Sequence, residues 1–146
     1  MREILDWKAR IAKAKAEIAD PVTSVVNVEV AGEMTEIGFR ELDPDLWLDL
    51  VATHPARKGS DVDTIAGYNV DAIAKAYPVE AITIDGDVPE VEDWADQLAV
   101  VSSPGRKFIS SAIFYVNQGM QAQRMAEAAG KASAGKGKRK SASPAS

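Results

Sequence analysis

The segment 38–57 constrains the fold more than any other part of the chain, because it carries signals for both ends of one helix. Asp43 can cap this helix, and Pro44 suits the first turn, where its missing N–H has no partner to lose. Pro55 prevents the helix from continuing and pushes the residue before it, His54, away from the helical conformation. We therefore predict a strand-like segment that leads into a short helix with defined ends.

The apolar residues of this helix recur at helical spacing, which predicts one apolar face. That face consists of Leu46, Trp47, Leu50 and Val51. The face is typical of packing against a core and by itself indicates no chemistry.

An earlier helix is predicted over residues 2–19. Ile4, Ile11 and Ile18 recur every seven residues, and Pro21 ends the pattern. Because this apolar stripe is narrow and rich in alanine, we expect the helix to pack on another element or on a partner helix. Two heptads are too few to predict a coiled coil.

Between residues 23 and 40 the apolar period changes from helical to alternating. Val26, Val28 and Val30 alternate with polar residues, and Ala31-Gly32 suits a two-residue turn in which the glycine has a positive φ. We expect a β-hairpin over about 23–40 that buries one face and leaves the other to solvent.

The rest of the chain up to about residue 129 is predicted to be mostly helical. We expect a loop over 56–68, and 79–84 suits either a strand or the first turn of a helix. Start and stop signals predict helices at about 69–77, 89–101 and 103–129, the first of them capped by Asn69 or Asp71 and the last by Ser103. The buried face of the second of these helices is predicted to consist of Val91, Trp94, Ala95, Leu98 and Val101.

The charge is divided unevenly along the chain. Residues 1–129 contain all 22 acidic side chains and 12 of the 17 basic ones, a net charge of −10, whereas residues 130–146 contain five basic side chains and no acidic one. The latter segment has no large apolar side chain that could offset the entropy of ordering, so it is predicted to be a disordered basic tail. Five charges without an aromatic residue favour a solubilising or partner-docking tail over nucleic-acid binding.

These elements together predict an α+β fold that is mainly helical. An N-terminal helix (1–20) precedes an α+β domain (21–129) that contains the hairpin and a small bundle of about four helices, and the tail (130–146) follows. No run of about 18 apolar residues is present, and the charged N-terminus lacks the apolar core of a signal peptide. We expect an intracellular protein without a membrane partner.

The residue types limit the chemistry that the chain can perform. It has no cysteine and one histidine, His54, whose place before a proline is typical of a structural helix-end residue. Asp61 and Asp63, like Asp85 and Asp87, have the spacing of calcium ligands but lack the glycine and glutamate that an EF-hand loop requires. We therefore predict that the protein is not an enzyme and has no cofactor and no metal site.

The three tryptophans lie on predicted helix faces, where the simplest interpretation is a core position. The alternative is contact with a protein partner, for which we consider Trp47, Trp94 and Phe108 the candidate binding residues. Trp7 is the tryptophan best suited to an interface, because its helix has the least apolar surroundings.

The order of several segments suggests a family. They are Ile37-Gly38-Phe39-Arg40-Glu41-Leu42, Asp45-Leu46-Trp47-Leu48-Asp49-Leu50-Val51-Ala52-Thr53-His54-Pro55, Gly67-Tyr68-Asn69, Ala76-Tyr77-Pro78, Pro89-Glu90-Val91-Glu92-Asp93-Trp94 and the late helical segment 112–117, followed by a basic, serine-rich end. In this order they resemble the short-form tail assembly chaperones of bacteriophages with long non-contractile tails, particularly those that infect actinobacteria. The resemblance covers roughly residues 35–146.

The resemblance implies a non-catalytic assembly factor that binds the tape measure protein until tail tube subunits polymerise around it. It also implies a longer partner product made by programmed ribosomal frameshifting, for which the codons of 135–138 are a candidate slippery site. Such a protein would act in the host cytoplasm, form an oligomer or remain a monomer, and be absent from the mature virion. The alternative is a structural virion protein, such as a head–tail connector or a minor tail component.

Overall fold

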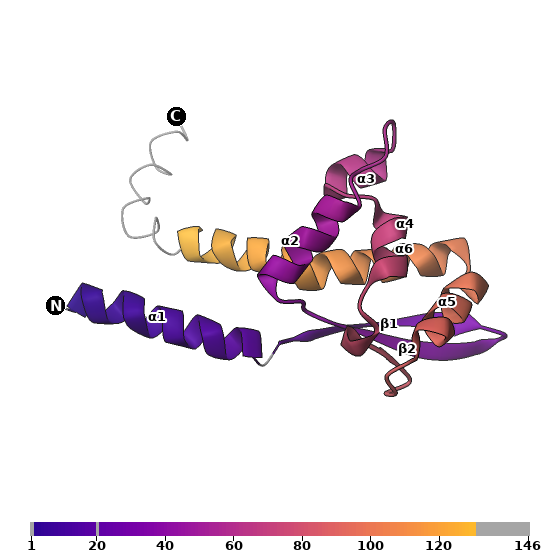
Figure 1. Ribbon diagram of the computed structural model, residues 1–146, viewed down its shortest axis with the longest axis horizontal. Helices are drawn as coiled ribbons and strands as arrows, with labels where there is room; N and C mark the ends of the chain where they lie inside the picture. Colours follow the sequence, from indigo (N-terminus) through magenta and orange to yellow (C-terminus); the bar gives the residue numbers. More distant parts are fainter. Residues whose placement is uncertain (1, 20, 131–146) are drawn as a thin grey trace, which may run out of the picture.

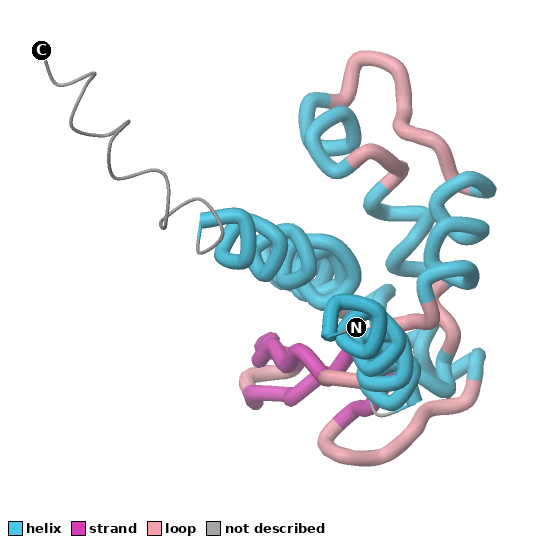
Figure 2. Tube along the Cα trace, turned by 90° about the vertical axis from the view of Figure 1, so that its left-hand side faces the viewer, coloured by secondary structure: helices cyan, strands magenta, loops and turns pink. Residues whose placement is uncertain are grey.

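The structure is a computed structural model that describes residues 2–19 and 21–130. It is an α+β fold in which helices cover one face of a small antiparallel sheet (Figure 1). Figure 2 shows the same arrangement from the side, with a long helix above the strands. The predicted fold class is confirmed, and the predicted tail lies, apart from Gly130, outside the described residues.

The sheet has the strand order β1-β2-β3. β1 (Thr23–Val30) and β2 (Glu33–Arg40) form the predicted hairpin, and both turn residues, Ala31 and Gly32, have positive φ angles of 54° and 83°. Positive φ at both positions is the condition of the hairpin turn that matches the twist of the strands. The hairpin and its turn are therefore as predicted.

The third strand answers a question that the sequence left open. Residues 79–84 divide into a short 3-10 helix, η1 (Val79–Ala81), and β3 (Ile82–Ile84), which pairs with β2. Both readings of this segment are thus partly right, because the proline before it starts a helical turn and its β-branched residues continue as a strand.

The helices follow the predicted order with one addition. They are α1 (Arg2–Ala19), α2 (Pro44–Thr53), α3 (Asp61–Ala66), α4 (Val70–Ala76), α5 (Val91–Val100) and α6 (Ser103–Phe114), and α6 leads into a π-helical turn, η2 (Tyr115–Gly119), and a helical segment over 120–130. None of the helices in the described part of the chain combines the length and the apolar character that a membrane span needs.

Two of the predicted helix starts are confirmed and one is shifted. Asp43 Oδ1 accepts a hydrogen bond from the N–H of Asp45 at 3.0 Å, and Asn69 caps α4. The cap of α6 is Ser102 rather than the predicted Ser103, because the Oγ of Ser102 accepts from the N–H of Gly105. The predicted boundary was therefore one residue late.

The predicted loop over 56–68 is wrong, because α3 lies within it. Ser60 caps α3 by accepting a hydrogen bond from the N–H of Asp63 at 3.2 Å, and Gly67, with a φ of 91°, ends it. Serine at the cap and a left-handed glycine at the end are local helix signals. They were missed because the apolar residues between them do not form a buried face.

Two predicted apolar faces also need correction. On α2, Trp47 is buried, but Leu46 is 46% exposed. Of the face predicted for α5, Trp94, Leu98 and the C-cap residue Val101 are buried, whereas Val91 and Ala95 are exposed. Helical spacing finds the apolar side of a helix but cannot show how much of that side a neighbouring element covers.

The core is centred on Phe39 of β2. Its ring makes edge contacts with Tyr77 (centroids 5.6 Å apart) and Trp94 (5.8 Å). The Nε1–H of Trp94 donates to the carbonyl oxygen of Ala74 at 2.9 Å, so its one polar group is satisfied within the core. This cluster joins the sheet to α4 and α5.

A second contact joins α6 to the chain around the end of β2. The buried Asn117 of η2 accepts a hydrogen bond from the N–H of Leu42 at 2.9 Å and donates to the hydroxyl of Tyr77 at 2.9 Å. The same hydroxyl donates to the carbonyl oxygen of Arg40 at 2.6 Å. Asn117 therefore holds three segments that are distant in sequence.

We predict that Asn117→Ala destabilises the fold strongly. It removes the acceptor of the Leu42 N–H and a donor to the Tyr77 hydroxyl, and each buried group left without a partner costs about 1–3 kcal/mol. Chemical denaturation should show a fall of roughly 2–4 kcal/mol in the free energy of unfolding. The matched control is Asn27→Ala on the exposed face of β1, which should change it by less than about 0.5 kcal/mol. Equal effects for the two variants would contradict this role.

Candidate protein-binding site

The structure separates the three residues that the sequence offered for protein binding. Trp94 and Trp47 are 2% and 5% exposed, and the Nε1–H of Trp47 donates to Gln118 at 3.1 Å while its ring meets Tyr68 edge-on. Both tryptophans are core residues, which is the simplest interpretation of the sequence, and the alternative of partner contact is wrong for them. Neither indole presents a surface to a partner.

Phe108, the third candidate, lies on the outside of α6 and is 57% exposed. Tyr115 follows seven residues later, is 48% exposed, and lies on the same side because seven residues make nearly two helical turns. The exposed Ser111 lies between them. We call these three residues the α6 stripe.

The opposite side of α6 fixes the stripe in place. The buried residues there are Ile109, Ala112 and Ile113 of α6 and Val116 of η2, and they belong to the hydrophobic core. Because this side packs on β1 and β2, the stripe faces away from the sheet. It is a rigid, two-aromatic surface on a folded helix.

A second exposed surface belongs to α1. Every side chain from 7 to 17 is exposed, including Trp7 (45%) and Ile11 (46%), and α1 extends away from the sheet (Figure 1). The ammonium group of Lys8 lies 5.8 Å from the centre of the Trp7 ring, which is within the range of a cation–π contact. The sequence indicated Trp7 as the tryptophan best suited to an interface, and its exposure is consistent with that expectation.

A shallow groove of about 360 Å³ lies at the base of α1. Its apolar lining includes Leu42, Leu46 and Pro78, and its charged lining is Arg40, Glu41, Asp43 and Glu80. No sequence pattern predicted this groove, because its walls come from three separate segments: Pro21, 40–46 and 78–81.

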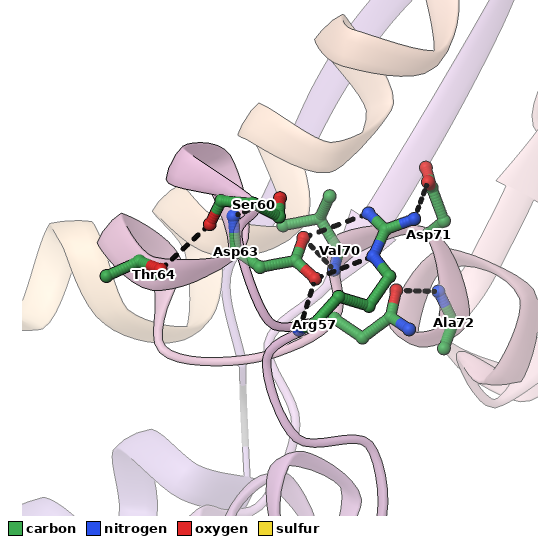
Figure 3. Close-up of polar contacts among 8 residues, drawn as sticks. Arg57, Ser60, Asp63, Thr64, Val70, Asp71 and Ala72 are labelled. Atoms are coloured by element: carbon green, nitrogen blue, oxygen red, sulfur yellow. Dashed lines mark hydrogen bonds and ion pairs between the residues drawn. The ribbon is translucent and has the colours of Figure 1, made fainter.

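The sequence also did not predict the pairing of Asp63 with Arg57 (Figure 3). Asp63 is fully buried, and its Oδ2 accepts from the Nε–H of Arg57 at 2.8 Å and from the backbone N–H of Arg57 at 2.9 Å. Its Oδ1 accepts from the Nη2–H of Arg57 at 3.0 Å and from the N–H of Val70 at 3.3 Å. On the outer side, Nη1 of Arg57 lies 3.0 Å from a carboxylate oxygen of Asp71.

This arrangement is structural and leaves no free lone pair for proton transfer. The hydrogen bonds from Arg57 hold the pKa of Asp63 far below its usual range, so the carboxylate stays ionised. Asp63 fastens the segment after α2 to the start of α4. Within the described residues, no three carboxylate, histidine or cysteine side chains lie close enough to hold a metal ion.

Comparisons with known proteins add no relative. No family model matches the chain, and neither a curated protein nor a solved structure matches it.

We predict that Asp63→Asn lowers the free energy of unfolding at pH 7. The neutral amide removes the charge-assisted bonds to Arg57, and its NH₂ group faces N–H donors where a carboxylate oxygen accepted from them. We therefore expect chemical denaturation to show a fall of roughly 1–3 kcal/mol in the free energy of unfolding. Asp71→Asn is the matched control: its side chain is 56% exposed, and it should change stability by less than about 1 kcal/mol. If the two variants lost equal stability, the buried contacts of Asp63 would contribute no more than an exposed ion pair, which would contradict this role.

The same contact predicts a pH dependence of stability. Because the pKa of Asp63 is lower in the folded than in the unfolded chain, its contribution is fully present above the unfolded value of about 3.9 and is lost as the pH falls below it. The stability difference between the native protein and Asp63→Asn should therefore shrink between about pH 5 and pH 2. A difference that stays constant over this range would contradict the assignment.

Proposed function

We propose that the protein is a tail assembly chaperone of bacteriophages with long non-contractile tails, and that it binds the tape measure protein during tail assembly. The family resemblance of residues 35–146 supports the proposal, and the mainly helical α+β fold is compatible with it. In this role the protein acts by binding and catalyses no reaction. It would work in the host cytoplasm together with its longer frameshifted form, and would leave before the tail tube closes around the client.

The residues that carry the resemblance define the fold rather than the client contact. Ile37, Phe39, Trp47, Tyr77 and Trp94 are all buried. A client must therefore bind to apolar side chains that the fold leaves outside.

The observation that carries the proposal is the α6 stripe. Phe108 and Tyr115 present two half-exposed aromatic rings two turns apart on a helix that is anchored in the core. Amphipathic helices place their own anchors at the same interval, so a helix of the client can pack along the stripe. Aromatic side chains supply much of the contact area in such interfaces.

The charge of the body suits a protein that keeps an aggregating client in solution. Residues 21–129 contain seven basic and 18 acidic side chains, a net charge of −11. A complex that carries this charge repels its copies and resists association. Exposed apolar side chains on a body of net negative charge are thus compatible with a chaperone of apolar helices.

We predict that the double variant Phe108→Ser, Tyr115→Ser loses the client. The measurement is co-expression with the tape measure protein, followed by quantification of the soluble, co-purified client. Removal of both aromatic anchors should reduce capture about tenfold or more, as truncation of central interface residues commonly does.

The matched control is Val100→Ser, an apolar residue of α5 that is 61% exposed and lies off the stripe. It should leave capture unchanged. Failure of the native protein to solubilise or retain the client would overturn the proposed function. Equal capture by the double variant would show that the client binds elsewhere.

A further inference from the structure

The side chains of α1 that the structure describes, those of residues 7–17, are all exposed in the single copy. The 18 residues of α1 carry an apolar seam of which Trp7, Ile11 and Ala14 are exposed to water. An isolated helix of this length is marginally stable, and helices gain most of their stability by packing an apolar face. We therefore expect the seam to pack against another surface.

The groove at the base of α1 has the chemistry to receive this seam. Leu46, 46% exposed, is its apolar wall, and about 360 Å³ is enough space for one large aromatic side chain. Three acidic side chains and one basic one, Arg40, make the lining net negative. An apolar residue flanked by cations is the complementary ligand.

α1 provides that combination. Its exposed segment 7–17 contains four basic side chains and one acidic one, Glu17, a net charge of +3. In a helix, Lys8 and Lys15 lie beside the seam of Trp7 and Ile11, because positions seven apart share a side. A basic seam thus faces an acidic groove, which favours the encounter between them.

The length of α1, which we call the arm, means that its tip can reach such a groove only on another copy. Trp7 and Ala19 are twelve residues apart in one continuous helix, about 18 Å at 1.5 Å per residue. A straight helix cannot turn its tip back into the groove at its own base. Two antiparallel arms, however, bring each tip to the other's base at the same time, and this closes a two-fold pair.

We propose that α1 is a dimerisation arm, and that in a pair of copies each arm places Trp7 in the groove beside Leu46 of the partner. This goes beyond the proposed function, since it needs no client. It also leaves the α6 stripe free, because neither Phe108 nor Tyr115 lines the groove.

The first test measures the oligomeric state of the isolated full chain by sedimentation or light scattering over a concentration series. The native protein should be a dimer, and Trp7→Ser and Leu46→Gln should each raise the dissociation constant about tenfold or more. Leu48→Gln is the matched control, because Leu48 is 62% exposed on the same helix but does not line the groove. Circular dichroism should be unchanged for all three variants, since every substituted side chain is exposed.

The second test uses the absence of cysteine from the native chain. Lys8→Cys and Glu80→Cys, made in separate chains and mixed, should form an intermolecular disulfide under mild oxidation. Lys13→Cys mixed with Glu80→Cys is the control, because Lys13 lies on the opposite side of α1 from the seam and should not react.

Three results would overturn the dimer. The first is a native chain that stays monomeric at all concentrations. The second is a dimer that is insensitive to Trp7→Ser and Leu46→Gln. The third is a disulfide within one chain when Lys8→Cys and Glu80→Cys are combined, which would place the arm on its own body. None of these results depends on client capture, so the dimer and the proposed function fail separately.

Discussion

The fold depends on the side chain of Asn117, which joins segments that local structure alone cannot bring together. It lies in the π-helical turn after α6, binds the N–H of Leu42 at the end of the sheet, and bonds to the hydroxyl of Tyr77 after α4. A π-helical turn changes the direction of the side chains that follow it, and such turns are retained where a side chain must be aimed. Here the turn aims Asn117 into the core.

This anchoring explains why the exposed surfaces are available for partners. With one side of α6 committed to the sheet and to Asn117, the other side keeps Phe108 and Tyr115 outside. The core around Phe39 is complete without them and without Trp7. Apolar side chains that a fold leaves out, on elements that it holds rigid, are the usual material of protein interfaces.

The sequence predicted those parts of the fold that depend on local signals. The hairpin over 23–40, the cap at Asp43 and the end of α4 before Pro78 each follow from a few neighbouring residues. Helical spacing also found the apolar sides of α2 and α5, but burial depends on what packs against them. For that reason the sequence favoured a core position for Trp47 and Trp94 but left contact with a partner open.

The features that the sequence did not predict are made by distant residues. The groove combines Pro21 with residues from 40–46 and 78–81, and Asn117 binds residues 40 and 75 positions earlier. The Arg57–Asp63 pair is closer in sequence, but α3, which positions Asp63, lacks the buried apolar face by which helices are recognised. Its signals are Ser60 and Gly67 alone.

We propose that this protein binds the tape measure protein during assembly and does not remain in the particle. Quantitative mass spectrometry of infected-cell lysates and of purified virions is the decisive experiment. We expect the chain to co-purify with the tape measure protein from lysates and to be absent from mature virions. Its presence in multiple copies per virion would contradict this proposal and would identify a structural component instead.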